Sequence, residues 1–526
     1  MSLLNDQLVE RAAASAGVIL LVTASLWLLH LVRTLWRLRH IPGPLLSKFT
    51  DLYRAQLVRT LRSHEIHQGF HDRYGAVVRL GPRMVSVSDP AAIPTIYPMR
   101  PGFPKGDFYE AFIPYLPGGS LPAIFTARDE NLHKRLKSPV ASLYNLSSIM
   151  KCEPSVDETL DVLFEQLDTR FVGTGKTVEL ADWLQYFAFD VMGTMTFSKR
   201  YGFLESGADN LGISTGIWNF MLTVGPMTQV PWLDKILHKN AIAAKLKKAS
   251  GNKIMQIAAD AVAERKAETA AKSESNGNGN GHSHKTTQKQ DFLGEFLKLQ
   301  SASESSPPWA PLVWTFSNII AGSDSTAVVM RTTLYHLLTH PADLARVRAE
   351  LDALPNLTST AETSKAGFKY PRWTDLNTLP YLSACVDEAV RLHPPFCLAL
   401  EREVPASGVV VCGTYLEPGT RVGMNPYVVN RHKGTFGEDA EVWRPGRWLE
   451  GDEEHRRKLA GSVMTFGAGR RVCLGKALGV LEVKKVVAAL VVNYEIDLID
   501  PKAYTVENSY FFRQKGILAK IRRRQA

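Results

Sequence analysis

The stretch at residues 466–475, Phe-Gly-Ala-Gly-Arg-Arg-Val-Cys-Leu-Gly, constrains this chain more than any other. Three glycines surround Cys473, so the backbone must turn tightly there and leave room beside the sulfur. From Leu474 to Val492 the sequence is rich in Ala, Leu and Val and reads as a helix, which places the cysteine at or just before a helix N-terminus. A positive helix end and the adjacent Arg470 and Arg471 favour a thiolate over a thiol. We therefore predict a flat, anionic metal cofactor on this sulfur. The alternative is a buried structural cysteine that follows a glycine turn.

Composition excludes several classes of protein. The chain has 526 residues and a net charge of +10, with part of the positive surplus at its two ends. That distribution suits an anionic membrane surface or an acidic protein partner, and no zinc-finger, helix-turn-helix or RNA-binding pattern points to nucleic acid. The five cysteines have no paired spacing, which argues against a disulfide framework and indicates a reducing compartment.

The N-terminal region reads as a membrane anchor. Residues 12–32 carry no charge and are dominated by Ala, Val and Leu; as a helix they are roughly 31 Å long, about the thickness of a hydrocarbon core. Acidic residues precede this run and arginines follow it, so the positive-inside rule places the N-terminus in the lumen and the chain after His40 in the cytosol. A cleaved signal peptide, the alternative, would carry its positive charge before the apolar run. The turn Ile41-Pro42-Gly43-Pro44 then redirects the chain.

The rest of the chain reads as one domain, 41–526, that follows an anchor at 1–40. Two short strands are expected within Gly75–Ser88, and an aromatic loop at 101–125 is either ordinary core or a wall of an apolar cavity. The apolar segment 217–237, which we expect to be interrupted at Gly225-Pro226, is predicted to be a mobile lid or a second membrane contact. Residues 272–290 are polar and of low complexity, and we predict a disordered surface insertion there.

A second chemical motif lies inside a long predicted helix, Pro311–Leu338. Ala321-Gly322-Ser323-Asp324-Ser325-Thr326 places a glycine, an acid and three hydroxyls where a core helix would carry leucine. Ser and Thr hydroxyls can bond to backbone carbonyls and open a helix locally, and such irregularities often mark functional sites. A simple polar helix face is the alternative.

A third pattern combines two segments. Glu388 and Arg391 lie three residues apart on the predicted helix Leu379–Leu392, and Arg447 lies in Trp443-Arg444-Pro445-Gly446-Arg447-Trp448. An exposed intrahelical pair would contribute little to stability. The second segment resembles the F-x-P-E-R-F motif of a known family, and that resemblance implies instead a Glu388–Arg391–Arg447 network with bidentate geometry, a rigid structural lock.

Together these motifs, in this order, resemble the cytochrome P-450 superfamily. The stretch Phe466–Gly475 matches its heme-thiolate signature, 321–326 its oxygen-activating A-G-x-D/E-T motif, and Glu388-x-x-Arg391 with Arg447 its conserved network. Ser325 stands where the family has threonine, and Gly446 where it has glutamate. The details look most like fungal microsomal members of the pisatin demethylase type.

The resemblance implies a fold and a set of site residues. The fold would be mainly α with a small β region, a cytochrome P-450 fold preceded by one transmembrane helix. Cys473 would ligate the iron of heme b, within a loop whose Phe466, Gly469 and Gly475 are motif positions. Gly322 would leave space for dioxygen, while Asp324 with Ser325 or Thr326 would help to deliver protons. Cations for the heme propionates would come from the following residues: Arg471, Arg402, His133 and Lys137.

The resemblance also implies partners and a location. Electrons would come from NADPH through a membrane-bound cytochrome P-450 reductase, whose acidic face could meet a basic patch of Lys476, Lys484 and Lys485. The protein would be a single-pass protein of the endoplasmic reticulum membrane, with its catalytic domain cytosolic and in contact with membrane lipid. The apolar small-molecule substrate would pack on these residues: Phe112, Phe316, Ile320, Phe396, Leu398, Phe511 and Phe512.

The implied activity is monooxygenation of that substrate with dioxygen, in secondary metabolism or detoxification. Two alternatives stay open. One is a desaturase, isomerase or ring-coupling enzyme that uses the same heme, and the other is a non-catalytic, membrane-tethered heme-binding protein.

Overall fold

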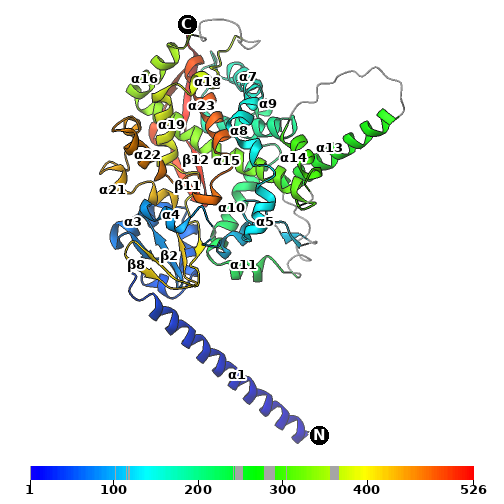
Figure 1. The fold of residues 1–526 in the computed structure, drawn as a ribbon, viewed down its shortest axis with the longest axis vertical. Coiled ribbons are helices and arrows are strands. Elements are labelled where there is room, and N and C mark those ends of the chain that lie inside the picture. Colours follow the sequence, from blue (N-terminus) through cyan, green and yellow to red (C-terminus); the bar gives the residue numbers. More distant parts are fainter. Residues whose placement is uncertain are drawn as a thin grey trace.

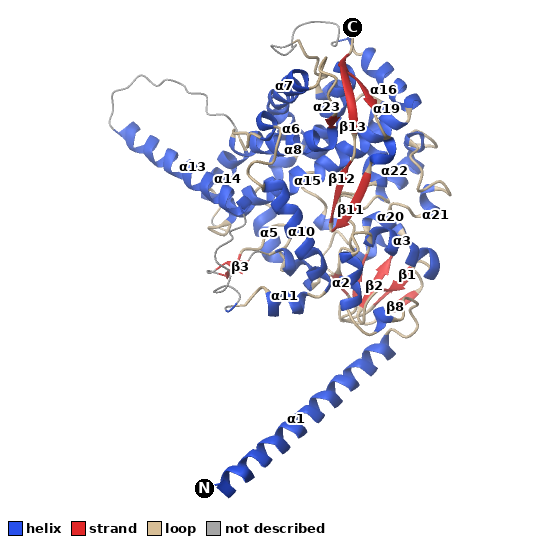
Figure 2. Ribbon diagram, turned by 180° about the vertical axis from the view of Figure 1, so that it is seen from behind, coloured by secondary structure: helices blue, strands red, loops and turns tan. Residues whose placement is uncertain are grey.

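The computed structural model describes residues 2–525 apart from the following: 101, 114, 117–118, 241, 243–252, 278–290, 304 and 356–366. Helices make up most of the described chain, and small sheets occupy the lower part and the middle of the molecule (Figures 1 and 2). The helices of seven or more residues are α1 (Ser2–Arg37), α2 (Leu52–Arg59), α3 (Ser63–Tyr74), α5 (Glu130–Lys137), α7 (Glu153–Arg170), α8 (Leu180–Phe197), α10 (Ile213–Gln229), α11 (Pro231–Leu237), α13 (Lys253–Gly277), α14 (Phe292–Ser301), α15 (Ala310–Thr339), α16 (Pro341–Asp352), α19 (Pro380–Leu392), α22 (Glu453–Gly461) and α23 (Lys476–Asn493). Shorter helices are α4 (Ile93–Ile96), α6 (Leu146–Ile149), α9 (Phe203–Ser206), α18 (Trp373–Leu376), α20 (Pro426–Val429) and α21 (Lys433–Phe436).

The strands are short. The largest sheet has the order β1-β2-β9-β6, with β1 (Val77–Arg79) antiparallel to β2 (Met84–Val87) as predicted for Gly75–Ser88. The remaining strands are β3 (Tyr115–Leu116), β4 (Gly119–Ser120), β5 (Val178–Glu179), β6 (Arg402–Glu403), β7 (Val409–Val411), β8 (Thr414–Leu416), β9 (Arg421–Gly423), β10 (Tyr494–Leu498), β11 (Thr505–Ser509), β12 (Phe511–Lys515) and β13 (Leu518–Arg523). This architecture, mainly α with a small β region, is the predicted fold class.

Helix α15 is the central element. It begins one residue before the predicted start, with Pro311 in its first turn, and ends at Thr339, just before His340-Pro341. Helices α8, α13, α14, α19 and α23 all pack against it, as its position in the middle of Figure 1 shows. Because α15 is enclosed in this way, its polar residues 322–326 lie in the interior.

Helix α23 follows the cysteine loop and is buried around nearly its whole circumference. This burial corrects one prediction about partners. Lys484 donates to the Ser383 hydroxyl (2.8 Å), and Lys485 forms ion pairs with Glu153 (2.8 Å) and Asp157 (2.7 Å). Both lysines are satisfied inside the protein, so only Lys476 of the expected basic patch is exposed.

Glu388, Arg391 and Arg447 come together as a buried ionic network. Arg391 donates to both carboxylate oxygens of Glu388 (2.7 and 2.9 Å), and Arg447 Nε donates to Oε1 (3.0 Å). The indole of Trp448 and the backbone N–H of Arg444 complete the set of donors (2.9 and 3.0 Å). Burial by itself raises the pKa of Glu388, but the two guanidinium groups outweigh it and hold that pKa below its usual value.

The network continues into the cysteine loop through Asn430. Arg391 donates to the Asn430 carbonyl (2.8 Å), and the Asn430 amide bonds to the Thr465 hydroxyl and to the backbone N–H of Met464 (both 2.8 Å). Thr465 immediately precedes Phe466, where the loop begins. Hydrogen bonds therefore connect Glu388 to the start of the loop that carries Cys473.

Helix α1 leaves the lower end of the molecule as a single rod (Figures 1 and 2). Within the described residues, Ala14–Arg37 is long and apolar enough to cross a membrane, and this stretch is not covered by the rest of the protein. Its last turn is docked on the domain, because Arg37 pairs with Glu417 and Arg79 donates to the Thr34 carbonyl (3.1 Å). At the predicted turn, Gly43 lies so close to the Arg79 backbone that a Cβ would approach the Arg79 carbonyl oxygen to 2.2 Å.

Two expectations for the middle of the chain differ from the structure. Helix α10 continues through Gly225-Pro226, where an interruption was predicted, and the break falls at Val230 instead. The helix persists because Gly225 packs directly on Ser509, whose hydroxyl donates to the Met221 carbonyl (2.8 Å). The predicted insertion at 272–290 begins as the last turns of α13, and residues 278–290 lie outside the described part of the chain.

The buried network predicts a large effect of removing its charge. Glu388→Gln should lower the free energy of unfolding by about 3 kcal/mol or more, because two guanidinium groups lose their buried carboxylate. Denaturant titration would measure the loss. Since the depressed pKa contributes stability above the usual glutamate value of 4.5, the difference from wild type should shrink as the pH falls below that value.

Glu453→Gln is the matched control. It breaks an exposed pair with Arg457, also within one helix, and should change the free energy of unfolding by less than about 0.5 kcal/mol. Equal effects of the two substitutions would contradict the structural role of Glu388.

Candidate active site

The cysteine loop is shaped by close approach of other backbone. Gly467 and Gly469 have φ of 66° and 61°, and the N–H of Cys473 donates to the Phe466 carbonyl (2.8 Å). A Cβ on Gly469 would lie 2.1 Å from the Tyr97 carbonyl oxygen, so only glycine fits there. This assigns Gly469 a different role from the predicted one, because it packs on residues 97–98 and does not line the cavity that the loop faces.

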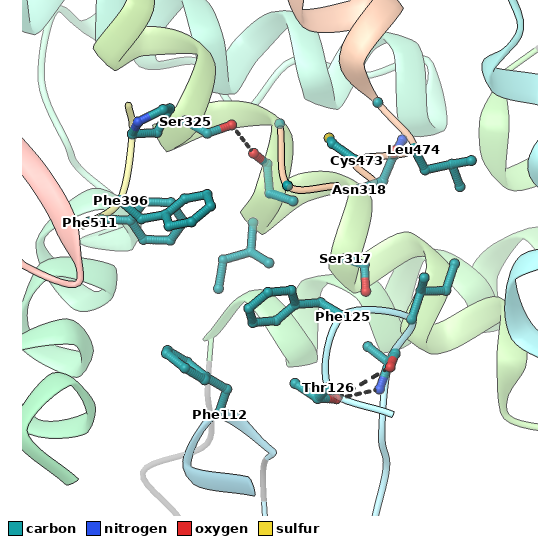
Figure 3. A pocket seen from close by; sticks show the side chains of 18 of the residues that line it. Phe112, Phe125, Thr126, Ser317, Asn318, Ser325, Phe396, Cys473, Leu474 and Phe511 are labelled. Atoms are coloured by element: carbon teal, nitrogen blue, oxygen red, sulfur yellow. Dashed lines mark hydrogen bonds between the residues drawn. The ribbon is translucent and has the colours of Figure 1, made fainter. Parts of the chain in front are cut away.

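That cavity has a volume of about 1250 Å³ and lies between the cysteine loop and α15. From the loop, Phe466, Cys473 and Gly475 line it, and from α15 Gly322, Ser325 and Thr326 do so. Figure 3 shows Ser325 and Cys473 toward one end of the cavity and Phe112 toward the other. The structure therefore brings the two chemical motifs to one space, although about 150 residues of sequence separate them.

The electrostatics of Cys473 differ from the sequence prediction. Cys473 is exposed to the cavity, yet the protein around its sulfur excludes much of the water, and this loss of solvation raises the pKa of the thiol. The N–H groups of Gly475 and Lys476 and the charges of Lys137 and Lys476 lower it. Arg471 does not serve the sulfur, because it points to Glu130 (2.6 Å) and to the Ala127 carbonyl (2.8 Å). The protein alone thus leaves this thiol above its ordinary pKa, and a bound metal ion would be what deprotonates it.

A group of basic side chains lines the cavity beside the loop: Lys105, His133, Lys137, Arg402 and Arg471. Within the described residues only Arg471 among them has a close carboxylate partner, Glu130. Two of the others donate to neutral acceptors: Arg402 to the Tyr109 hydroxyl (2.8 Å) and Lys137 to the Arg470 carbonyl (2.9 Å). His133 lies farther from the carboxylate of Glu130, at 3.8 Å. The cluster therefore holds more positive charge than the protein compensates.

The pKa values in this cluster show the same imbalance. Burial, followed by the charges of Arg402 and Arg471, puts the pKa of Lys105 well below its usual range. Burial and the nearby Arg471 and Lys137 lower the pKa of His133 to about 3. An anion placed here would reverse these shifts. A flat cofactor with carboxylate groups fits this donor set, with the carboxylates at the basic cluster and the metal at Cys473.

Lys105 is a site residue that the sequence did not reveal. It lies in the aromatic loop, its ammonium group is 3.9 Å from the centre of the Tyr109 ring, and its backbone pairs with Arg402 in an isolated bridge. The one signal in the sequence is that Lys105 is a lone lysine in an apolar segment. Its partner Arg402 lies about 300 residues away, so no spacing pattern links the two residues.

On α15, the predicted residues divide between two faces. Ser325 lines the cavity and its hydroxyl donates to the Ala321 carbonyl (2.5 Å), as Figure 3 shows. Thr326 also lines the cavity, and its hydroxyl makes no hydrogen bond in the described part of the chain. Gly322 allows α8 to approach, because a Cβ there would meet the Met192 sulfur at 2.5 Å. The predicted role of Gly322 toward dioxygen stays a prediction.

Asp324 lies outside the cavity lining and faces α8. Its Oδ1 accepts a hydrogen bond from Gln185 Nε2 (2.8 Å), and its Oδ2 is buried without a partner among the described residues. Burial raises the pKa of Asp324 to about 6, although Arg331 and the Gln185 hydrogen bond oppose the shift. An acid with this pKa exchanges protons near neutral pH. Gln185 was not identified from the sequence.

The predicted substrate residues are placed in two groups. Phe112, Phe316, Ile320, Phe396 and Phe511 line the cavity, and Phe396 and Phe511 are adjacent in an isolated bridge (Figure 3). Leu398 and Phe512 do not. Leu398 is fully buried in an apolar cluster, and Phe512 points to the other face of β12, where it packs on His64 and His393. Phe125, in the aromatic loop expected as a possible cavity wall, also lines the cavity, whereas Ser317 and Tyr510 line it and were missed.

A thiol that faces an apolar cavity beside an uncompensated basic cluster is the arrangement of a heme-thiolate protein. A family model described as Cytochrome P450 matches residues 44–518. The chain therefore belongs to the cytochrome P450 family. Membership implies heme iron held by a cysteine thiolate, a redox partner, dioxygen and a small-molecule substrate.

Curated relatives agree with this assignment. The chain is 51% identical over 496 residues to cytochrome P450 monooxygenase asR2 of Sarocladium schorii, which covers 94% of each chain. It is 50% identical over 496 residues to cytochrome P450 monooxygenase pkfB of Emericella nidulans, again 94% of each. It is also 50% identical over 495 residues to cytochrome P450 monooxygenase mpaDE of Penicillium brevicompactum, which covers 94% of this chain and 56% of that protein. The chain is thus an enzyme, an oxidoreductase of the monooxygenase kind, and the non-catalytic alternative is set aside.

Proposed function

We propose that the Cys473 thiolate would hold the iron of a heme b, and that the enzyme inserts one oxygen atom into an apolar small molecule. The supporting observation is that one cavity joins the Cys473 sulfur, the basic cluster and the polar residues of α15. When bound, heme supplies the activation of dioxygen. The chain supplies a thiolate at Cys473, cations at Lys105, Arg402 and Arg471 for the propionates, and an apolar space that excludes water.

Proton supply is assigned to α15. Asp324 exchanges protons on the α8 side, and Ser325 presents a hydroxyl on the cavity side, one residue farther along the helix. The Ser325 hydroxyl donates to the Ala321 carbonyl, so it would turn away from that carbonyl to give its proton to the cavity, while its lone pairs accept the replacement proton. Gly322 lets this segment lie close to Met192 of α8, and the Thr326 hydroxyl lies beside Gly479 of α23.

Electrons are proposed to come from NADPH through a cytochrome P450 reductase in the membrane. The exposed Lys476, beside the cysteine loop, supports an acidic partner surface there. The names of the relatives support a role in fungal secondary metabolism, with detoxification as the other candidate. Desaturation, isomerisation or ring coupling with the same heme is the alternative chemistry, and it would leave no label from ¹⁸O₂ in the product.

For location, we propose a single-pass anchor at residues 1–40 in the endoplasmic reticulum membrane, with 41–526 as one cytosolic catalytic domain. Helix α11 lies at the same end of the molecule as the exit of α1 (Figures 1 and 2). It exposes Trp232, Ile236 and Leu237 by 53%, 62% and 51%, and Leu45 and Leu46 are exposed beside α1. These side chains support a second, interfacial contact with lipid rather than a lid alone.

The ligand assignment predicts the spectrum of one variant. Cys473→Ser should abolish the strongly red-shifted absorption band of the reduced, carbon monoxide-bound heme, because that shift requires thiolate ligation. Cys412→Ser, at an exposed cysteine in the β7–β8 turn, is the control and should keep the band. A band that persists in Cys473→Ser would show that another residue ligates the iron.

The proton assignment predicts a difference between neighbouring hydroxyls. Ser325→Ala should reduce product per NADPH consumed by about tenfold or more, while Ser325→Thr keeps it, because a hydroxyl at this position is what the reaction uses. Thr326→Val is the matched comparison and should retain coupling. If Thr326→Val uncouples the enzyme and Ser325→Ala does not, the role belongs to Thr326.

The membrane assignment predicts residual binding after truncation. Protein that lacks residues 2–40 should still bind partly to liposomes in flotation assays, and Trp232→Glu with Ile236→Glu should abolish that binding. Val442→Glu, at an equally exposed apolar residue away from α1, is the control. A truncated protein that remains wholly soluble would mean that α1 is the sole anchor.

A further inference from the structure

Tyr510 has an unusual backbone conformation at the edge of the cavity. It is the single residue between β11 and β12, where Ser509 pairs with Phe511, and its φ is 76°. Bulky residues rarely adopt this left-handed region, and glycine would occupy it without strain. The conformation is held from outside, because the Tyr510 carbonyl accepts hydrogen bonds from the Cys397 N–H (3.1 Å) and the Asn508 amide (3.2 Å). Such strain at a non-glycine residue points to a role for its side chain.

The Tyr510 ring forms the centre of an aromatic wall. The residue is only 3% exposed and lines the cavity. Its ring centre is 4.6 Å from that of Phe112 and 5.5 Å from that of Phe396, with which it is stacked at 20°. Further rings of the wall are Phe511 (5.3 Å), Phe108 (6.0 Å) and Phe125 (6.5 Å). Several of these residues are visible around the cavity in Figure 3. Flat aromatic molecules pack well against such a surface.

The Tyr510 hydroxyl differs from most hydroxyls that line this cavity. Those of Tyr144 and Thr126 are already used, by Asn318 Oδ1 (2.7 Å) and by the Ala123 N–H (2.8 Å). The Tyr510 hydroxyl makes no hydrogen bond to any residue that the structure describes. Burial raises its pKa well above the usual range, so it stays protonated and can donate. The hydroxyl faces the cavity, so a ligand that displaces water from it must supply an acceptor in place of that water.

We propose that Tyr510 selects the substrate: its ring packs on a flat aromatic molecule, and its hydroxyl donates a hydrogen bond to an oxygen substituent of that molecule. The inference rests on the proposed function, because it takes this cavity to be the substrate site. It adds a substrate class, oxygenated aromatic compounds, and names the residue that would recognise the oxygen substituent. The hydroxyls of Ser317 and Thr326 also line the cavity without a partner in the described chain. Thr326 lies beside Gly479 of α23, next to the cysteine loop, so Ser317 is the competing donor.

The test uses the full-length, heme-loaded protein and two probes, naphthalene and 2-methoxynaphthalene, with dissociation constants from isothermal titration calorimetry. Tyr510→Phe should weaken 2-methoxynaphthalene binding by about two- to tenfold, the effect of one neutral hydrogen bond, and leave naphthalene binding unchanged. The variant should fold normally, because the hydroxyl has no protein partner to lose. Tyr335→Phe is the control: it removes a tyrosine hydroxyl that donates to the Pro501 carbonyl (3.1 Å) away from the cavity lining, and it should leave the ratio of the two constants at its wild-type value.

Three results would overturn the proposal. In the first, Tyr510→Phe leaves the preference for 2-methoxynaphthalene intact. In the second, Ser317→Ala removes the preference in its place, which would make Ser317 the donor. In the third, decalin, the saturated counterpart of naphthalene, binds as tightly as naphthalene, which would exclude selection by aromatic packing. Failure of the proposed function would be seen separately, as purified protein without heme absorbance.

Discussion

The buried carboxylate of Glu388 is the interaction on which the architecture of the site depends. A negative charge that is inaccessible to water requires several donors, and here they come from α19 and from residues 444–448, while Arg391 also donates to the Asn430 carbonyl. Satisfying one charge therefore brings three distant segments together. Asn430 then holds Met464 and Thr465, which lead directly into the cysteine loop. A metal ligand needs this kind of support, because a loop held by its own contacts alone would leave the sulfur poorly positioned.

The charges on the other side of the loop are arranged in the opposite way. Around Glu388 every charge has partners, whereas Lys105, Lys137 and Arg402 have only neutral acceptors among the described residues. Leaving cations uncompensated in the interior is unfavourable in the free protein and favourable once an anion binds. The fold therefore gains stability from its cofactor, since a ligand that binds only the folded state shifts the unfolding equilibrium. The Glu388–Arg391–Arg447 network is therefore stable without any ligand, whereas the basic cluster becomes stable only when an anionic cofactor binds beside it.

Local patterns predicted the elements, and long-range contacts decided which residues reach the cavity. The helices at 311–338 and 379–392, the strands near 75–88 and the contact of Glu388 with Arg391 follow from spacing and residue type alone, whereas the contact with Arg447 was predicted from the family resemblance. Lys105 and Gln185 were missed because each acquires its role from a partner far along the chain. Leu398 and Phe512 were wrongly expected in the cavity because hydrophobicity does not say where a side chain points. Leu398 lies in an irregular segment before β6 and is buried in an apolar cluster, and Phe512 lies on the face of β12 opposite Phe511. Lys484 and Lys485 were wrongly expected at the surface because two carboxylates and a serine, none of them near in sequence, satisfy them inside.

Departures from local rules gather around the substrate side of the cavity and are linked to one another. Pro226 sits inside α10, where it removes one backbone donor, and Gly225 beside it lies against Ser509. Ser509 donates to the Met221 carbonyl of the same helix and immediately precedes Tyr510, the strained residue of the aromatic wall. Since α10 also lines the cavity through Ile217, Met221 and Val224, the helix over the cavity and the wall at its side are joined through one serine. A displacement of α10 would therefore be transmitted to Tyr510, so the shape of the aromatic surface and the position of its free hydroxyl are set together.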